Sequence, residues 1–143
     1  MQKVLLAVDG SDSCNKAIKK VADMAEEMEI ELTVLTVIEE KLFETGGSEG
    51  QIIAEQMAMK DEVEDKAEDI MGACVGAFDH VEEIDKKVEY GDPAKKICEE
   101  ASNQNYDIVA LADMGKSSVK KFLLGSTAEK VVRYCNTTVM VVK

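Results

Sequence analysis

The sequence predicts one α/β domain over residues 1–143, with a doubly wound, five-stranded parallel sheet and helices on both faces. Five short apolar runs, typical of buried strands, alternate strictly with four amphipathic helical patterns. Each helical segment is long enough for a right-handed crossover between parallel strands. With 143 residues, 45% hydrophobic and 32% charged, the chain has the size and composition of a soluble domain with its own core.

The first strand, helix and second strand follow from the N-terminal pattern. The continuous apolar run 3–9 ends at the turn signal Asp9-Gly10-Ser11-Asp12 and predicts a strand buried on both faces. A helix over 14–28 follows, because apolar residues recur there every three or four positions after Ser and Asp residues that can cap a helix. The β-branched run 32–38 predicts the second strand.

The middle of the chain predicts a loop, a long helix and a strand near the sheet edge. Residues 39–50, with two adjacent glycines, predict the loop, and the apolar stripe over 51–78 predicts the helix. Residues 81–90 alternate apolar and charged side chains, which is typical of a strand with one wetter face. Gly91-Asp92-Pro93 ends that strand, caps the next helix and places proline at its first position; the helix runs to about Asn103.

The last third of the chain carries the strongest functional pattern. Runs 107–111 and 138–142 predict strands, and residues 128–135 predict a helix between them. The intervening loop contains Ala112-Asp113-Met114-Gly115, nine further residues, and Gly125-Ser126-Thr127. Glycines let backbone N–H groups approach a phosphate closely, and a helix N-terminus adds unpaired donors and the positive dipole end. The loop therefore predicts a phosphate-bearing ligand.

The predicted topology gathers three segments at one edge of the sheet. In doubly wound sheets a ligand lies outside the carboxyl ends of the strands, where the winding direction switches. Those ends carry Asp9, the segment 37–39 and the segment 112–115, which converge if the first and fourth strands are central neighbours. The residues alone leave two alternatives open: Asp9 could only cap the first helix or close the Gly10 turn, and Gly125-Ser126 could form only a capped strand-to-helix turn.

Charge and composition exclude several function classes. A net charge of −12 and a pI near 4.5 argue against nucleic-acid or anionic-membrane partners, which require a basic surface. We expect a cytoplasmic protein, because the sequence contains neither a signal-peptide pattern nor an apolar run of about 18–20 residues. His80 is the only histidine, which excludes a histidine-based metal site and a Ser-His-Asp triad.

The cysteines and two short motifs predict no chemistry of their own. Cysteines 14, 74, 98 and 135 form no C-x-x-C pair and lie on or beside apolar helical stripes, so we expect buried, reduced thiols. Gly115-Lys116-Ser117 mimics the end of a Walker A loop, but the first glycine of that motif would fall at Ala110, inside a strand. No G-x-G-x-x-G follows the first strand, so a dinucleotide-binding dehydrogenase is unsupported.

Several of these segments together resemble the universal stress protein family over nearly the whole chain. The first strand with its aspartate (4–11), the second strand (33–39) and the turn Gly91-Asp92-Pro93-Ala94 are similar to those of the family. The strongest match is to the family's ATP-binding signature, G-2x-G-9x-G-(S/T). Gly115, the nine-residue gap and Gly125-Ser126 fit that signature in register, and 138–142 resembles the family's closing strand.

The resemblance implies a Rossmann-like fold of the adenine nucleotide alpha hydrolase-like type, with ATP as the ligand. It implies that Asp9 and the backbone around Val37 contact adenine and ribose. The phosphates would be held through N–H and hydroxyl donors of Ala112, Gly115, Gly125, Ser126 and Thr127. It also implies a homodimer paired through the strand Thr138 to Val142. Because the family has no strong catalytic machinery, at most slow ATP hydrolysis is expected.

The chain departs from the signature at two positions. Ala112 replaces the first glycine, which costs about 1 kcal/mol if that position needs a positive φ and almost nothing otherwise. The carboxylate of Asp113, at about 5 Å from a phosphate charge, would repel it by roughly 3 kcal/mol at an effective dielectric constant of about 20. Bound Mg²⁺ would reverse the sign and make Asp113 a candidate ligand of the ion.

These observations support a homodimeric, ATP-binding regulatory protein of the stress response. Because the family also has members that bind no nucleotide, the alternative is a nucleotide-free dimeric interaction module, and Ala112-Asp113 motivates it. A slow ATP hydrolase is a third hypothesis, for which only Asp113 or Asp9 could serve as the general base.

Overall fold

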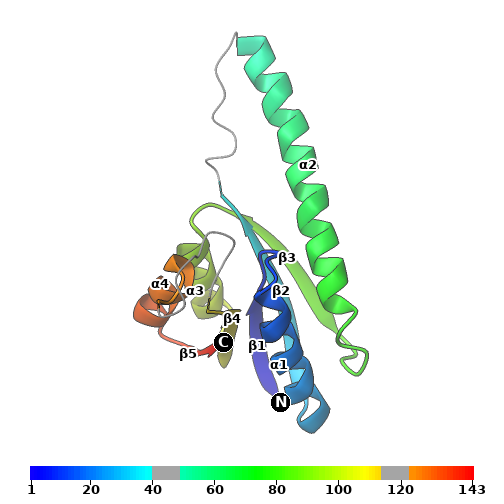
Figure 1. Ribbon diagram of the computed structural model, residues 1–143, viewed down its shortest axis with the longest axis vertical. Coiled ribbons are helices and arrows are strands. Elements are labelled where there is room, and N and C mark those ends of the chain that lie inside the picture. The colour runs from blue at the N-terminus through cyan, green and yellow to red at the C-terminus, as the bar shows by residue number, and fades with distance from the viewer. Residues whose placement is uncertain (40–48, 114–122) are drawn as a thin grey trace.

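The computed structural model describes residues 1–39, 49–113 and 123–143, and for 49–56 the helical backbone only. Its five strands form one parallel sheet in the order β3-β2-β1-β4-β5 (Figure 1). The strands are β1 Gln2–Ala7, β2 Ile30–Ile38, β3 Ile84–Tyr90, β4 Ile108–Ala112 and β5 Thr138–Val142. The helices are α1 Cys14–Glu27, α2 Glu49–Val75, α3 Pro93–Asn103 and α4 Ser126–Tyr134.

The doubly wound α/β architecture predicted from the sequence is confirmed. Strands and helices alternate in the predicted order, the third strand lies at an edge, and β1 and β4 are neighbours within the sheet. The ends of some elements differ. Helix α2 stops at Val75, because the next residues form a turn in which Phe78 N–H donates to the Val75 carbonyl at 3.0 Å. Strand β3 begins only at Ile84, since Val81 N–H still bonds back to Phe78 at 3.1 Å.

Two hydrophobic cores sandwich the sheet. Figure 1 shows α1 and α2 on one face of the sheet and α3 and α4 on the other. The first core joins Val4 and Leu6 of β1 to α1 and α2, while the second joins Leu5 to α3 and α4. Because successive strand residues point to opposite faces, the buried part of β1, from Val4 to Ala7, is apolar at every position.

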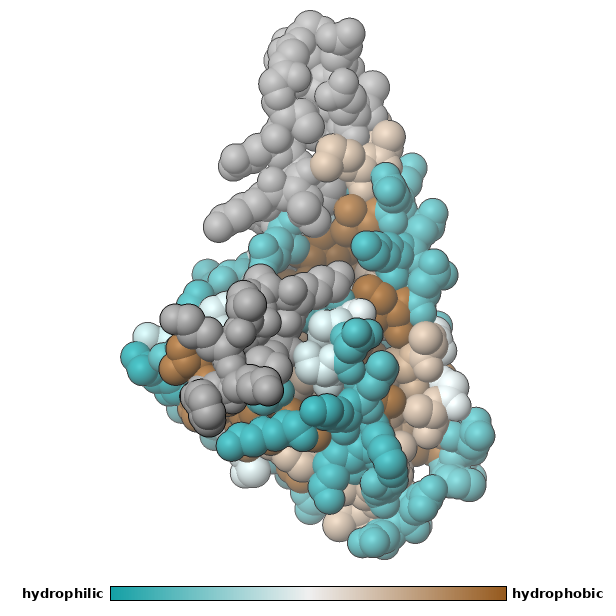
Figure 2. Space-filling model, viewed as in Figure 1, coloured by the Kyte–Doolittle hydropathy of each residue, from teal (hydrophilic) through white to brown (hydrophobic). Residues whose placement is uncertain are grey.

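Helix α2 is longer than the sheet it covers. Its 27 residues span about 40 Å at 1.5 Å per residue, and its N-terminal end projects beyond the strands (Figure 1). Its buried residues lie in the C-terminal half, at Ala67, Met71 and Cys74, and the last two belong to the first core. Hydrophilic residues predominate on the outer side of α2 in Figure 2, as expected for a solvated acidic helix face.

The predicted start of α3 is confirmed in detail. Asp92 is the N-cap, and its carboxylate accepts a hydrogen bond from Lys95 N–H at 2.9 Å. Pro93 occupies the first helical position, where its missing N–H costs nothing. The cap and proline together fix where β3 gives way to α3.

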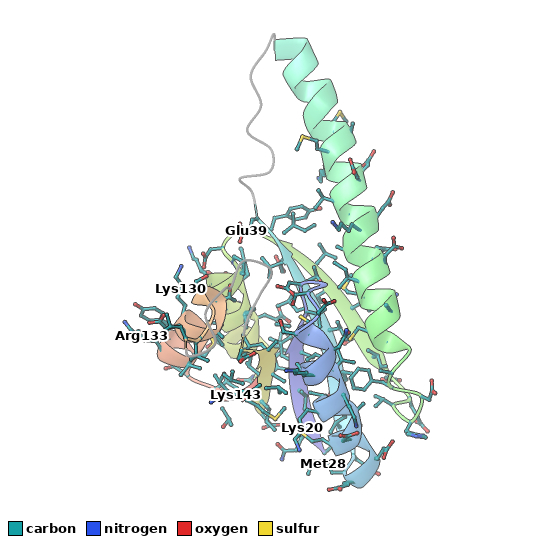
Figure 3. All side chains as sticks on the ribbon, in the orientation of Figure 1. Lys20, Met28, Glu39, Lys130, Arg133 and Lys143 are labelled. Carbon is teal, nitrogen blue, oxygen red and sulfur yellow. A yellow bond between two sulfur atoms is a disulfide. The ribbon has the colours of Figure 1, made fainter. Side chains whose placement is uncertain are left out.

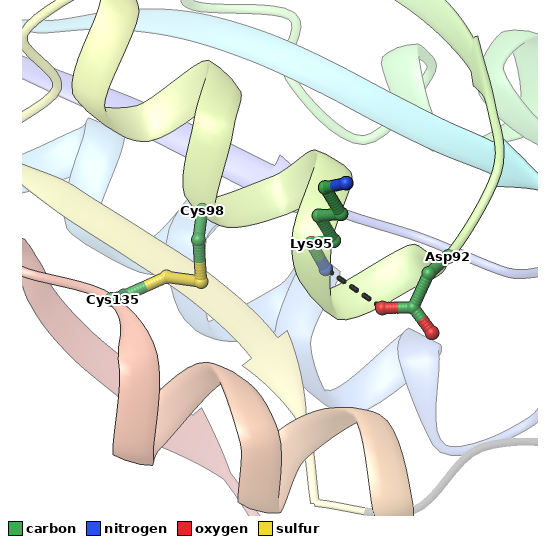
Figure 4. Close-up of a disulfide and its surroundings, with 4 residues drawn as sticks. All are labelled: Asp92, Lys95, Cys98 and Cys135. Atoms are coloured by element: carbon green, nitrogen blue, oxygen red, sulfur yellow. Dashed lines mark hydrogen bonds between the residues drawn. A yellow bond between two sulfur atoms is a disulfide. The ribbon is translucent and has the colours of Figure 1, made fainter.

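The prediction of four reduced cysteines is wrong for two of them. Cys98 in α3 and Cys135, just after α4, form a disulfide (Figure 4), whereas Cys14 and Cys74 are free and buried. The prediction failed because the two bonded cysteines are remote in sequence and meet only when α3 and α4 pack on the same sheet face. Closing a loop with a sequence separation of 37 stabilises the fold by about 4 kcal/mol in the chain-entropy account.

At Gly10, both the backbone conformation and the packing require glycine. Its φ is +77°, and a Cβ built there would lie 2.8 Å from Ile70 Cδ1 and 2.9 Å from Ile70 Cγ1. The turn after β1 therefore needs glycine twice, for its left-handed backbone and for the close approach of α2.

Replacing Gly10 with alanine should destabilise the protein by about 2 kcal/mol, because the new methyl group meets Ile70 and the backbone is strained. Chemical denaturation followed by far-UV circular dichroism measures this. Gly72→Ala is the matched control: nothing lies within 4 Å of its added Cβ and the residue is helical, so stability should rise by about 0.5–1 kcal/mol. Equal effects of the two substitutions would contradict the packing at Gly10.

Candidate functional site

The candidate site lies at the carboxyl ends of the central strands. Ala7, the last residue of β1, pairs with Leu35 of β2, and Leu6 pairs with Ala110 of β4. The chain leaves β1 toward one side of the sheet and returns on the other side through β4, so β1 and β4 flank the switch point. This is the position at which doubly wound sheets bind ligands.

Asp9 lies two residues beyond β1, at this switch point. Its Oδ1 accepts hydrogen bonds from the Ser11 N–H at 2.9 Å and from the Cys14 thiol at 2.9 Å. The carboxylate thus closes the turn through Gly10. This is one of the structural roles that the sequence left open for Asp9. The same bonds hold the side chain at the edge where a ligand would lie.

Cys14 is a site residue that sequence reasoning did not identify. Burial, followed by the hydrogen bond to Asp9, raises the pKa of the Cys14 thiol, so the group stays protonated at neutral pH and acts as a donor. Burial raises the pKa of Cys74, in the same core, to about 12. The available signal for Cys14 was its place, at the first position of α1 and five residues after Asp9.

Asp113 is anchored through its backbone on both sides. Its N–H donates to the Val142 carbonyl at 3.0 Å, and its carbonyl accepts from the Gly125 N–H at 2.7 Å. These two bonds bring the end of β4, the end of β5 and the start of α4 together. The Gly125 N–H, expected from the resemblance to face a phosphate, is directed to Asp113 instead.

The first turn of α4 supplies the remaining backbone donors. Gly125 is the N-cap, and its carbonyl accepts from Glu129 N–H at 2.9 Å. Helical geometry leaves the N–H groups of Ser126 and Thr127 without a carbonyl in their own helix. Both lie at the positive end of the helix dipole, which favours an anionic ligand.

Of the remaining site residues named from the sequence, the structure describes Val37 and Ala112 but not Gly115. Val37 is half-buried on the α3 side of β2, while Ala112 is buried on the opposite face of β4. The described non-glycine residues with positive φ do not include Ala112, so alanine there carries no backbone penalty. Gly115 falls outside the described residues. The structure thus brings Asp9, Ala112 and Gly125 to one edge of the sheet, with Val37 in the adjoining strand.

The described residues provide neither a cluster of metal ligands nor a membrane-spanning helix. No cluster of three or more His, Cys, Asp or Glu side chains in residues 1–39, 49–113 and 123–143 could hold a metal ion. Within those same ranges, no helix combines the length and apolar character needed to cross a membrane.

A groove of about 480 Å³ lies between α3 and α4. Asp92, Cys98 and Glu99 line it from the α3 side, and Lys130 and Tyr134 line it from α4. Lys130 and Arg133 project from the outer side of α4 (Figure 3). Lys130 Nζ lies 4.0 Å from Asp92 Oδ1, an exposed pair that contributes little stability.

The chain is similar in sequence and in structure to known proteins. The chain is 28% identical to the universal stress protein MJ0531 of Methanocaldococcus jannaschii over 99% of its own length and 82% of that protein. The solved structure of hypothetical protein MJ0577 is 25% identical, with a TM-score of 0.85, and the match covers 99% of this chain and 95% of that one.

Two more distant structures share the fold and hold nucleotides. A universal stress protein in complex with cAMP is 22% identical with a TM-score of 0.62, over 99% of this chain and 96% of that one. The universal stress protein from Archaeoglobus fulgidus in complex with dAMP is 18% identical with a TM-score of 0.63, over 100% and 98% of the two chains.

The sequence profile described as the universal stress protein family matches residues 1–143, the whole chain. The chain therefore belongs to the universal stress protein family.

Proposed function

We propose that this protein is a homodimeric regulatory protein that binds ATP, with Mg²⁺, at the carboxyl edge of its sheet. The observation that supports this most is the hydrogen bond from Gly125 N–H to the Asp113 carbonyl, which returns the start of α4 to the end of β4. The unpaired amides of the first α4 turn then point out of the same edge that carries Asp9. Family members in complex with cAMP and dAMP support an adenine nucleotide as the ligand.

The proposed ligand lies across the switch point. Its phosphates contact the backbone of Ala112 and Gly115 and the N–H and hydroxyl groups of Ser126 and Thr127. Adenine and ribose lie toward Asp9 and the backbone around Val37. The Asp9 carboxylate is an acceptor for ribose hydroxyls, and the Ser11 and Cys14 bonds hold it in place.

Nucleotide occupancy, rather than turnover, is the proposed signal. The proposal treats residues 1–143 as one domain acting in the cytoplasm in a stress response. Any hydrolysis would be slow, because the described part of the edge offers carboxylates but no histidine: His80 lies in the turn after α2, beside Glu26 at 4.0 Å.

Asp9→Asn should weaken binding of MgATP about tenfold or more, because a carboxylate acceptor is lost while the turn to Ser11 can still form. Isothermal titration calorimetry on the full chain measures the affinity. Asp23→Asn is the matched control, since it removes the same charge from an exposed α1 side chain that pairs with Lys19. Absence of binding heat in the unsubstituted protein at millimolar MgATP would reject nucleotide binding altogether.

Asp113→Asn should change the response to Mg²⁺. Without the metal, removal of the carboxylate relieves a repulsion of roughly 3 kcal/mol at about 5 Å, so ATP should bind up to about a hundredfold more tightly. With Mg²⁺ present, the same substitution should leave affinity unchanged or lower it, because a ligand of the ion is lost. Calorimetry in EDTA and in magnesium buffer compares the two conditions. An equal effect in both would show that Asp113 does not face the phosphates.

The second part of the proposal is dimerisation through β5. This strand is an edge of the sheet, and its apolar residues are only half-buried, at Val139, Met140, Val141 and Val142. The Val142 carbonyl accepts from Asp113 and so faces β4. Because backbone groups alternate along a strand, those of Val139 and Val141 face outward and are available to a second copy of the strand.

Val141→Pro should convert a dimer into a monomer, because proline removes an outward N–H but leaves the ladder to β4 intact. Sedimentation equilibrium at micromolar protein measures the mass. Met140→Pro is the contrasting variant: its N–H faces β4, so it should lower the melting temperature more than Val141→Pro does. A dimeric Val141→Pro protein would place the interface elsewhere. A dimer that binds no nucleotide would favour the alternative function, a nucleotide-free interaction module.

A further inference from the structure

The four cysteines of this chain fall into two chemically different pairs. Cys14 and Cys74 are buried in the first core, and burial raises the pKa of both thiols, so they are poor nucleophiles. Cys98 and Cys135 are half-buried, bonded to each other, and lie on the opposite face of the sheet. Only the second pair is both oxidised and within reach of solvent.

The bonded pair lies beside an open groove. Cys98 lines the groove of about 480 Å³ between α3 and α4. Figure 4 shows the disulfide bridging α3 and the end of α4, with Cys98 six residues along the chain from the Asp92 cap. Cys98 therefore borders a space that a small thiol can enter from solvent.

We propose that Cys98–Cys135 is a thiol–disulfide exchange site, whose reactant is a dithiol that enters through this groove. A thiolate of the dithiol attacks the Cys98 sulfur, the bond between the two protein sulfurs breaks, and the Cys135 sulfur leaves and takes a proton. The second thiol of the reactant then attacks the mixed disulfide. Two electrons and two protons pass to the protein, which gains two thiols, and the reactant becomes a disulfide.

The disulfide controls a helix that packing alone holds weakly. Helix α4 has nine residues, and only Ala128 and Val131 are buried among them. A helix this short is marginal unless its neighbours hold it. Its start is tied to Asp113 through Gly125, and its end is tied to α3 through Cys135. Reduction therefore releases the covalent attachment of α4 to α3.

Release of α4 should weaken nucleotide binding, a step that rests on the proposed function. The unpaired amides of Ser126 and Thr127 belong to this helix, and a ligand that uses them must order the helix when it binds. We expect the reduced protein to bind adenine nucleotide about fivefold or more weakly than the oxidised protein, within the usual range of coupling between two sites.

The exchange site is tested first on the unsubstituted, oxidised full chain. The protein is treated with dithiothreitol under native conditions, alkylated with N-ethylmaleimide and analysed by intact and peptide mass spectrometry. Two additions should appear, on Cys98 and Cys135, while Cys14 and Cys74 stay unlabelled until denaturant is added. A disulfide that resists millimolar dithiol in the native protein, or labels on Cys14 and Cys74, would overturn the proposal.

A second measurement tests where attack occurs. With glutathione disulfide as the probe, Cys135→Ser, which leaves the Cys98 thiol, should form a mixed disulfide faster than Cys98→Ser, which leaves the Cys135 thiol. The reverse order would remove the groove from the mechanism. Cys74→Ala is the matched control, because it removes a cysteine but keeps the bonded pair, and its response to dithiothreitol should equal that of the unsubstituted protein.

Hydrogen exchange and nucleotide titration separate this proposal from the proposed function. Amide exchange in α4 should accelerate on reduction, whether or not nucleotide is present. If neither redox form binds nucleotide, the proposed function fails while the labelling and exchange results still decide the redox site. If both forms bind nucleotide equally, the coupling through α4 is rejected.

Discussion

The constraint on which the rest of the structure depends is the burial of β1 on both faces. Val4, Leu5 and Leu6 are 0% exposed, and they alternate between the two cores. A central strand of this kind requires a helical layer on each side, and therefore a chain that winds in both directions from it. The switch in winding occurs next to β1. Asp9, two residues beyond β1, therefore lies at the edge of the sheet that carries the candidate site.

The fold could be predicted from the sequence because its signals are local. Alternation of β-branched runs with amphipathic stripes identified every strand and helix, and Gly91-Asp92-Pro93 located the start of α3. The disulfide could not be predicted, because it depends on which helices share a face of the sheet. The candidate site could be predicted in part. The predicted topology brought Asp9 and Ala112 to one edge, but only the structure shows that Gly125 N–H donates to the Asp113 carbonyl and that the Cys14 thiol donates to Asp9.

The overall charge of the molecule and the local character of its candidate site have opposite effects on anion binding. A net charge of −12 repels an anionic ligand at long range and slows its approach. That repulsion is screened beyond about 8 Å at physiological ionic strength, whereas contacts with backbone N–H groups act within hydrogen-bonding distance. The proposed binding of a nucleotide at this edge would therefore depend on a few oriented donors and on Mg²⁺, which lowers the charge of the ligand itself.

Helix α4 connects the proposed nucleotide site to the proposed thiol–disulfide exchange site. Its nine residues span about 14 Å, with the candidate phosphate donors at one end and Cys135 just past the other. A long, deeply packed helix would isolate its ends from each other, because packed side chains would hold it whatever happened at either terminus. With two buried side chains, α4 depends on its end attachments, so a change at one end alters the cost of ordering the other. Because this helix is weakly packed, the state of the disulfide to α3 would change the affinity for a nucleotide bound at the end of β4.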